Sequence, residues 1–310
     1  MQKRKNQLRL MLLAALTVAT VLVFWWLQPE NRMQVPQDIF RIGELNKIDR
    51  VELASDSAAV VLGFTEGKWR VNDRYDADAN MIRVLFATLQ QARPKRAVAR
   101  ARQDSIFNTL SMSGVKVSLF EGEQLRKHFF AGGNASRSQA FFADPETKEV
   151  YVMTIPGYRV YVSGILELNE NGWRDKLVFG FNWQNFKSLE ALFPAKPSEN
   201  FRVAMARNFF GIENMPEADT SRLNNFLDDV SLLTVDEYLT LPGLSDSLDQ
   251  TEPQLEIRVT DVGNRTYRLR MFRSGAGQDV FGLIQESQLA VFAPRKFQAL
   301  FKPKSFFIKK

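Results

Sequence analysis

The chain has 310 residues, 45% of them apolar and 12% aromatic, which is enough to bury a large core in one or two domains. Its net charge is +6, but four positive charges belong to Lys3, Arg4, Lys5 and Arg9, so only +2 is left for the rest of the chain. This nearly neutral remainder argues against a nucleic-acid binder. The absence of cysteine excludes disulfides, thiolate metal sites and an acylated lipoprotein anchor.

An uncharged segment, residues 10–27, follows the basic residues at positions 1–9. At about 1.5 Å per residue, a helix of this length reaches roughly 27 Å, close to the hydrocarbon thickness of a bilayer. Trp25 and Trp26 stand where an interfacial aromatic belt is expected, and the preceding basic residues predict a cytoplasmic N-terminus. We therefore predict a single-pass transmembrane helix over residues 10–27, with the later residues outside the cytoplasm.

A cleaved secretory signal is the alternative, because it also combines a basic start with an apolar core. Cleavage needs small residues directly after the core, whereas this core ends in the bulky residues 24–27. The aromatic end therefore favours a retained anchor. Residues 28–39, with Pro29 and Pro36, predict a short, stiff linker to the folded part.

Beyond the linker, the pattern of apolar residues repeats after about 141 positions. One buried helix face is predicted from the spacing of Ile82, Leu85, Phe86 and Leu89. The residues 141 positions later are again apolar: Leu223, Phe226, Leu227 and Val230. An Ala-Asp pair precedes each helix, so Asp78 and Asp219 are predicted to cap the helices by accepting hydrogen bonds from backbone N–H groups.

Alternating apolar residues predict antiparallel strands around both helices. Two strands joined by a turn at residues 66–67 precede the first helix, and Trp69 and its counterpart Phe210 are predicted as core aromatics. Later strands are predicted at 97–102, 116–121, 125–131, 140–143 and 149–153, and again at 255–260, 266–272, 280–284 and 289–292.

The predicted fold class is α+β, with two tandemly repeated units of antiparallel sheet, each covered by one helix. Turn residues around Asn171 and Gly172 mark the boundary between the units. The predicted organisation is a basic N-terminus at 1–9, a transmembrane helix at 10–27, a linker at 28–39, a first unit at 40–168, a connector at 169–181 and a second unit at 182–310.

Several short motifs together resemble a bacterial family called domain of unknown function 4340. The motifs are residues 47–53, Gly67-Lys68-Trp69, Tyr75-Asp76-Ala77-Asp78 and Trp173-Arg174-Asp175-Lys176. Members of that family are typically anchored envelope proteins, and some are encoded beside ABC transporters of the type linked to gliding motility. The resemblance thus implies a bacterial inner-membrane protein with periplasmic or extracytoplasmic domains, and it transfers no catalytic residue.

Few residues suggest chemistry. His128 is the only histidine, which excludes a multi-histidine metal site, and we interpret it as structural. Asp73, Asp76 and Asp78 cluster before the first helix, where carboxylates could serve glycoside hydrolysis or hold calcium, but their spacing lacks the pattern of an EF-hand. We therefore predict no catalytic residue, no cofactor and no metal.

A stretch predicted as one strand, residues 94–102, is the surface feature that most suggests binding. Alternation would place Arg96, Arg100 and Arg102 on one face, with the alanines between them on the other. Such a stripe suits lipid headgroups, an acidic wall polymer or a protein partner, although most such stripes are simply solvated.

The sequence favours a non-catalytic, membrane-anchored binding or scaffold subunit of an envelope complex, with the bilayer contacted through residues 10–27 and an envelope or transporter protein as partner. The family resemblance adds an ABC transporter as the candidate partner. The alternative is a carboxylate-dependent enzyme, or a binding module, that acts on cell-wall or surface polysaccharide. Asp76 and Asp78 are the carboxylates on which the enzymatic alternative depends.

Overall fold

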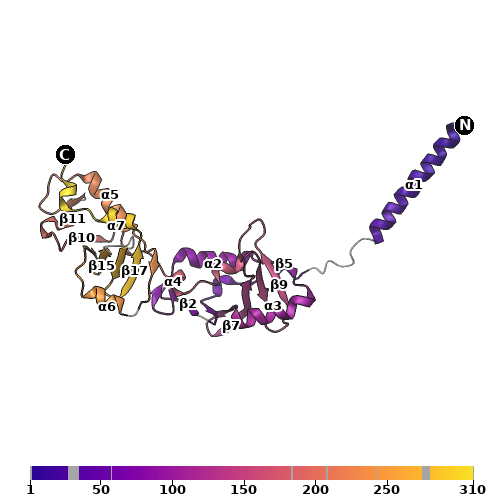
Figure 1. The fold of residues 1–310 in the computed structure, drawn as a ribbon, viewed down its shortest axis with the longest axis horizontal. Helices are drawn as coiled ribbons and strands as arrows, with labels where there is room; N and C mark the ends of the chain where they lie inside the picture. The colour runs from indigo at the N-terminus through magenta and orange to yellow at the C-terminus, as the bar shows by residue number, and fades with distance from the viewer. Residues whose placement is uncertain are drawn as a thin grey trace. The chain divides into compact units, whose positions relative to one another are not determined.

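The computed structural model describes residues 2–26, 35–56, 58–182, 184–206, 209–241, 243–273 and 280–309. Contacts between Cα atoms divide the chain into two compact units: residues 1–57 with 84–167, and residues 58–83 with 168–310. Each unit contributes helices and antiparallel strands (Figure 1). The predicted α+β class with two sheets is therefore confirmed.

The first sheet has nine strands in the order β4-β3-β2-β1-β6-β7-β8-β9-β5. The strands are β1 (Arg50–Ala54), β2 (Ala59–Thr65), β3 (Lys68–Val71), β4 (Tyr75–Asp76), β5 (Arg93–Ala97), β6 (Val115–Glu121), β7 (Gln124–Gly133), β8 (Ala140–Ala143) and β9 (Val150–Thr154). In the turn between β2 and β3, Glu66 and Gly67 both have positive φ, which matches the two-residue hairpin turn predicted there.

The second sheet has eight strands in the order β12-β11-β10-β14-β15-β16-β17-β13. The strands are β10 (Phe186–Leu192), β11 (Phe201–Ala206), β12 (Phe209–Ile212), β13 (Glu237–Tyr238), β14 (Leu255–Asp261), β15 (Thr266–Arg273), β16 (Val280–Ile284) and β17 (Gln288–Phe292). The later strands of both sheets lie within a few residues of their predicted positions, apart from the one predicted at 97–102.

The helices connect these strands. They are α1 (Gln2–Trp26), α2 (Ala79–Gln91), α3 (Arg100–Ser113), α4 (Glu170–Trp173), α5 (Thr220–Ser231), α6 (Leu244–Asp249) and α7 (Pro294–Leu300). The described residues also include the short 3₁₀ helices η1 (Leu45–Lys47), η2 (Val162–Ile165), η3 (Pro197–Glu199) and η4 (Lys304–Phe307).

The two sheets share one strand order once β4 is set aside. The order β3-β2-β1-β6-β7-β8-β9-β5 in the first matches β12-β11-β10-β14-β15-β16-β17-β13 in the second. The hairpin registers also agree: Leu62 pairs with Val71, and Val203 pairs with Ile212, each 141 positions later. The same apolar pattern therefore builds the same strand neighbours in both sheets.

Burial follows the predicted helix faces. Leu223, Phe226, Leu227 and Val230 of α5 are buried in one core with the strands of the second sheet. In α2, Ile82, Leu85 and Leu89 are buried and Phe86 is half-buried. A smaller core joins Leu110 of α3 to β8 and β9 through Phe141 and Val152.

Both Ala-Asp pairs lie at the start of their helix. The Asp78 carboxylate accepts a hydrogen bond from the Asn80 backbone N–H at 2.7 Å, and Asp219 accepts one from the Arg222 N–H at 3.1 Å. A segment that follows later in the sequence pairs with each of them: Ala77 forms an isolated antiparallel β-bridge with Arg174, and Ala218 forms one with Ile308. The two Ala-Asp pairs are thus held in the same way.

Loss of the Asp219 cap should cost about 1 kcal/mol of the free energy of unfolding. Asp219→Ala removes the acceptor for the Arg222 N–H, whereas Asp219→Asn keeps a side-chain oxygen there and should cost only a few tenths. Thermal unfolding of the full chain in detergent, followed by circular dichroism, measures the difference. Equal melting temperatures for the alanine and asparagine variants would show that the cap contributes nothing.

The strand predicted at 94–102 is correct only as far as Ala97. β5 ends at Ala97, Val98 is buried, and α3 begins at Arg100. Ala97, Ala99 and Ala101 are exposed instead of facing a covering helix. The alternation in this stretch fails as a strand signal because a helix starts within it.

The N-terminal segment forms the long helix α1. From Leu10 to Val23, its large apolar side chains are between 54% and 74% exposed. No helix among the described residues is both long enough and apolar enough to cross a membrane. The side chains of Trp25 and Trp26, and residues 27–34, lie outside the described part of the chain.

Candidate functional site

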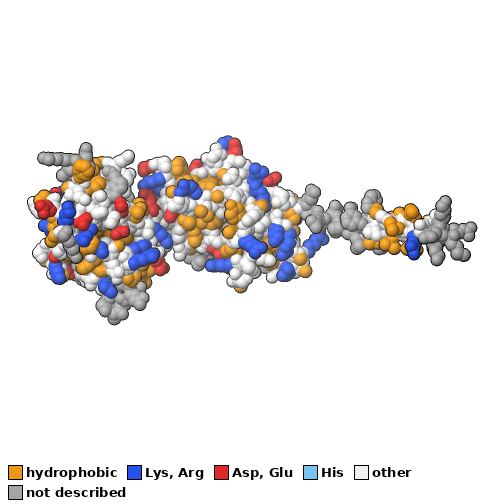
Figure 2. Space-filling model, turned by 90° about the horizontal axis from the view of Figure 1, so that it is seen from above, with side chains coloured by type: hydrophobic (Ala, Val, Ile, Leu, Met, Phe, Trp, Pro, Cys, Tyr) orange, Lys and Arg blue, Asp and Glu red, His pale blue; other side chains and the backbone are white. Residues whose placement is uncertain are grey.

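The three arginines predicted to bind a partner or an anion are all exposed, but they do not share one strand face. Arg96 lies on β5, and Arg100 and Arg102 lie in the first turn of α3. Lys95 is exposed beside them. Among the described residues, none of the four forms an ion pair, and Figure 2 shows lysine and arginine side chains gathered where β5 and α3 lie.

The acidic residues before α2 have structural partners. Asp76 forms an ion pair with Lys68 at 2.8 Å, and the Asp78 carboxylate caps α2. Burial raises the pKa of Asp175, and the charges of Asp78 and Asp76 raise it further, against the hydrogen bond that Asp175 accepts from the Leu177 N–H. Asp76 and Asp78 thus each have a structural partner in the fold.

His128 lies half-buried on β7, opposite Ser118 of β6. No group of three or more histidine, cysteine, aspartate or glutamate residues in the described part of the chain could hold a metal ion. The predicted core aromatics are half-buried rather than fully buried. Trp69 packs against Phe64, and Phe210 packs against Phe186 and against the core of the second sheet.

Arg174 belongs to one of the motifs found in the sequence, but its buried place in the fold was not predicted. Its guanidinium lies between two tyrosine rings, 3.7 Å from the ring centre of Tyr75 and 3.6 Å from that of Tyr238. Nη2 donates to Gln288 Oε1 at 2.8 Å, and Nη1 donates to Asn171 Oδ1 at 3.1 Å. Only 6% of Arg174 is exposed, and burial lowers its pKa.

No signal in the sequence separates this arginine from a solvated one, because three of its four partners, Tyr75, Tyr238 and Gln288, come from distant segments. The contacts of Arg174 hold these segments of one unit together. The two tyrosine rings and the two amide oxygens already contact its guanidinium. Arg174 is therefore a structural centre.

A groove of about 360 Å³ lies in the unit formed by residues 1–57 and 84–167. Tyr161 and Glu167 line it and are hydrogen-bonded to each other, and Arg137 pairs with Glu167 at 3.3 Å. Burial, followed by the bond to Glu167, raises the pKa of Tyr161. These three polar groups of the groove thus satisfy one another.

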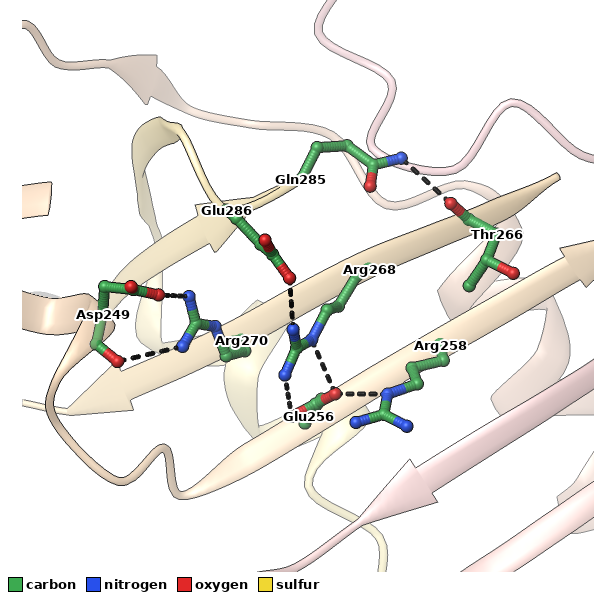
Figure 3. A network of polar contacts seen from close by, with 8 residues as sticks. All are labelled: Asp249, Glu256, Arg258, Thr266, Arg268, Arg270, Gln285 and Glu286. Atoms are coloured by element: carbon green, nitrogen blue, oxygen red, sulfur yellow. Dashed lines mark hydrogen bonds and ion pairs between the residues drawn. The ribbon is translucent and has the colours of Figure 1, made fainter. Parts of the chain in front are cut away.

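The second sheet carries a network of charged side chains on β14 and β15 (Figure 3). Glu256 accepts hydrogen bonds from Arg258 and from Arg268, with Arg268 Nε 2.7 Å from Oε1. Arg268 also contacts Glu286, and Arg270 contacts Asp249. Burial by itself raises the pKa of Glu256, but the hydrogen bonds and charges of the two arginines outweigh it and lower the pKa.

This network should make stability depend on pH. Because folding lowers the pKa of Glu256, its contribution is present above about pH 4.5, the usual pKa of a glutamate, and is lost as pH falls through the lowered value. Glu256→Gln should therefore lower the free energy of unfolding by about 1–3 kcal/mol near neutral pH. The difference between wild type and variant should shrink towards zero well below pH 4.5.

Urea unfolding at a series of pH values measures that difference. Glu286→Gln is the matched control, because Glu286 bonds the same Arg268 but its side chain is 62% exposed, and it should change stability by less than about 0.5 kcal/mol. A Glu256→Gln difference that stays constant with pH would contradict the assigned linkage.

Comparison with known proteins supplies a family. The model of the family described as domain of unknown function DUF4340 matches residues 69–256, more than half of the chain. The match includes Trp69, both Ala-Asp pairs and the Trp173-Arg174 segment. No curated protein and no solved structure matches the chain. The chain belongs to the DUF4340 family.

Proposed function

We propose that this protein is a non-catalytic, membrane-anchored binding or scaffold subunit of a bacterial cell-envelope complex. The observation that carries the proposal is α1, whose large apolar side chains from Leu10 to Val23 are mostly exposed. Each such side chain gains about 1.5–3 kcal/mol when it leaves water. The apolar run of the sequence continues through residues 24–27, beyond the described side chains, to a length that suits a bilayer.

The charge pattern supports one orientation of this anchor. The apolar run follows the basic residues Lys3, Arg4, Lys5 and Arg9. The proposed orientation therefore has the N-terminus in the cytoplasm and the two units on the periplasmic or extracytoplasmic side of the inner membrane. The alternative to be excluded is cleavage of the segment as a secretory signal.

Two measurements test the anchor. The mass of the protein purified from membranes should correspond to a chain that retains residues 10–27, and carbonate washing should leave it in the membrane fraction. Protease added to spheroplasts should degrade both units. A mature chain that begins after Trp26, or units protected from the protease, would refute this part of the proposal.

The scaffold role is supported by the architecture outside the anchor. The two sheets share their strand order and hairpin register, and we infer that they arose by tandem duplication. A duplicated module offers two related surfaces to an assembly, and an ABC transporter of the type linked to gliding motility is the proposed partner.

Crosslinking in intact cells tests the partnership. A photo-crosslinking residue at the exposed apolar positions 209 or 232 should capture a transporter subunit, whereas the same residue at exposed position 247 controls for non-specific capture. Mass spectrometry of the mild-detergent complex identifies the captured chain. Repeated recovery of the protein alone would contradict the scaffold role.

The alternative, an enzyme acting on wall or surface polysaccharide, is favoured by one observation: the pKa of Asp175 is raised by burial and by the neighbouring Asp76 and Asp78. Asp76→Asn with Asp78→Asn tests it, because asparagine preserves the cap of α2. Loss of an envelope phenotype with an unchanged melting temperature would favour chemistry over scaffolding. Asp73→Asn is the matched control, because Asp73 is exposed.

A further inference from the structure

We propose that the cations at the junction of β5 and α3 bind anionic phospholipid headgroups of the membrane that holds the N-terminal segment. The junction surface comprises Lys95, Arg96, Arg100 and Arg102. This inference rests on the proposed membrane anchor and assigns a ligand to the arginines that the sequence singles out.

The charges of the junction surface are available to a ligand. All four side chains are exposed, and none forms an ion pair with another described residue. By contrast, Arg268 and Arg258 of the second sheet both contact Glu256. No acidic residue interrupts the sequence from 93 to 103, and the first one after it is Asp104.

The geometry suits a broad surface better than a small ligand. β5 is the last strand of its sheet, so Lys95 and Arg96 lie on an open edge. Arg100 and Arg102 are two residues apart in the first turn of α3, and at about 100° per residue they project to opposite sides of it. A single phosphate cannot meet side chains that diverge in this way, whereas separate headgroups around the start of α3 can.

The length of the chain limits how far this surface can lie from the proposed anchor. Gln37 Nε2 donates to the backbone oxygen of Pro94 at 3.2 Å, so the segment that comes from α1 reaches the folded unit beside β5. Only residues 27–36 separate the end of α1 from Gln37, and ten residues span at most about 35 Å. An acidic wall polymer or a distant protein has no such constraint, and this proximity favours the membrane itself.

The full chain in lipid nanodiscs provides the test. Because the protein has no cysteine, Ala101→Cys gives one labelling position between Arg100 and Arg102, and Ser247→Cys gives an exposed reference on α6. A fluorophore at each position is quenched by a nitroxide carried on a lipid headgroup. The discs contain phosphatidylcholine alone, or an equimolar mixture with phosphatidylglycerol.

The expected result is quenching at position 101 that is about twofold stronger in the anionic discs and unchanged at position 247. Salt at about 1 M should abolish the difference, because it shortens the screening length to roughly 3 Å. The combined Arg96→Gln, Arg100→Gln and Arg102→Gln variant should also abolish it. The combined Lys196→Gln, Arg295→Gln and Lys309→Gln variant changes the same number of exposed cations elsewhere and should not.

Equal quenching at position 101 in both kinds of disc, or a difference that survives the triple arginine substitution, would overturn the proposal. So would a response to soluble alginate, an acidic polysaccharide, without a response to phosphatidylglycerol, which would assign the surface to a polymer. Failure of the anchor is a separate outcome, because the protein would then not enter the discs at all. Melting temperatures confirm that both triple variants are folded.

Discussion

Replacing Phe307 by alanine is expected to lower the free energy of unfolding by about 3–5 kcal/mol. Phe307 is fully buried and contacts the rings of Phe201 and Phe226, with centroids 5.0 and 5.6 Å away. Its backbone oxygen accepts a hydrogen bond from the Asp219 N–H at 2.8 Å. The substitution therefore opens a cavity at the point where the end of the chain meets the start of α5.

The neighbouring Phe306 provides the control. It is 37% exposed, and Phe306→Ala should cost about 1 kcal/mol or less. For a unit of this size, the loss at Phe307 corresponds to a fall of roughly 6–20 °C in melting temperature. Calorimetry of the full chain in detergent measures both variants, and similar melting temperatures for the two would show that the Phe307 site collapses without a cavity.

Trp173 occupies the equivalent place at the start of α2, and Trp173→Ala should cause a loss of similar size, about 3–5 kcal/mol. It is fully buried, and its backbone oxygen accepts from the Asp78 N–H at 2.8 Å, as Phe307 accepts from Asp219. The same calorimetric scan measures it. A small effect at Trp173 and a large one at Phe307 would mean that the two residues contribute differently to the free energy of unfolding.

The elements that sequence reasoning located share a strong local signal. The hairpin at residues 66–67 needs positive φ at two successive positions, and the Glu-Gly pair supplies the glycine that such a turn favours. The apolar face of α5 is set by four residues at helical spacing, and Asp219 marks its start. In each case one element is decided by neighbours within a few residues.

Sequence reasoning missed α3 and gave β5 the wrong end, because both elements depend on distant partners. α3 presents only a narrow apolar face, of which Leu110 is buried and Phe107 packs against Phe130 of β7, so its helical period is weak in the sequence. β5 contains Pro94, which a strand tolerates at an edge, and its edge position depends on pairing with β9, more than fifty residues later. Pairing across such distances is invisible to periodicity.

The candidate site divides in the same way. Exposure of Arg96, Arg100 and Arg102 was predictable, because arginine side chains are rarely buried without a partner. Their grouping around a strand end and a helix start was not predictable, since the same amino-acid sequence is compatible with one strand that continues to position 102. The burial of Arg174 required four separate chain segments to meet, which no local pattern encodes.

Substitutions of Arg174 should distinguish the contribution of its positive charge to stability from that of its planar guanidinium. Arg174→Ala is expected to lower the free energy of unfolding by about 3 kcal/mol, because it removes two hydrogen bonds from a cationic donor and two ring contacts in a buried place. Among the described residues no carboxylate pairs with this guanidinium, so its burial is compensated by the rings of Tyr75 and Tyr238 and by two amide oxygens.

Two further substitutions distinguish the contributions. Arg174→Lys keeps the charge but loses the planar fork, and it should still cost about 2 kcal/mol. Arg174→Met fills the space between the rings without burying a charge, so it should cost about 1 kcal/mol, chiefly from the amide oxygens left without a donor. The order alanine, lysine, methionine is therefore expected in urea unfolding of the full chain.

Arg74→Ala is the matched control, because Arg74 also lies over the ring of Tyr75, at 5.0 Å, but is exposed. It should change stability by less than about 0.5 kcal/mol. A lysine variant as stable as wild type would show that a positive charge alone suffices at position 174. In that case, the planar stacking between the two tyrosines would be incidental to the stability of the unit.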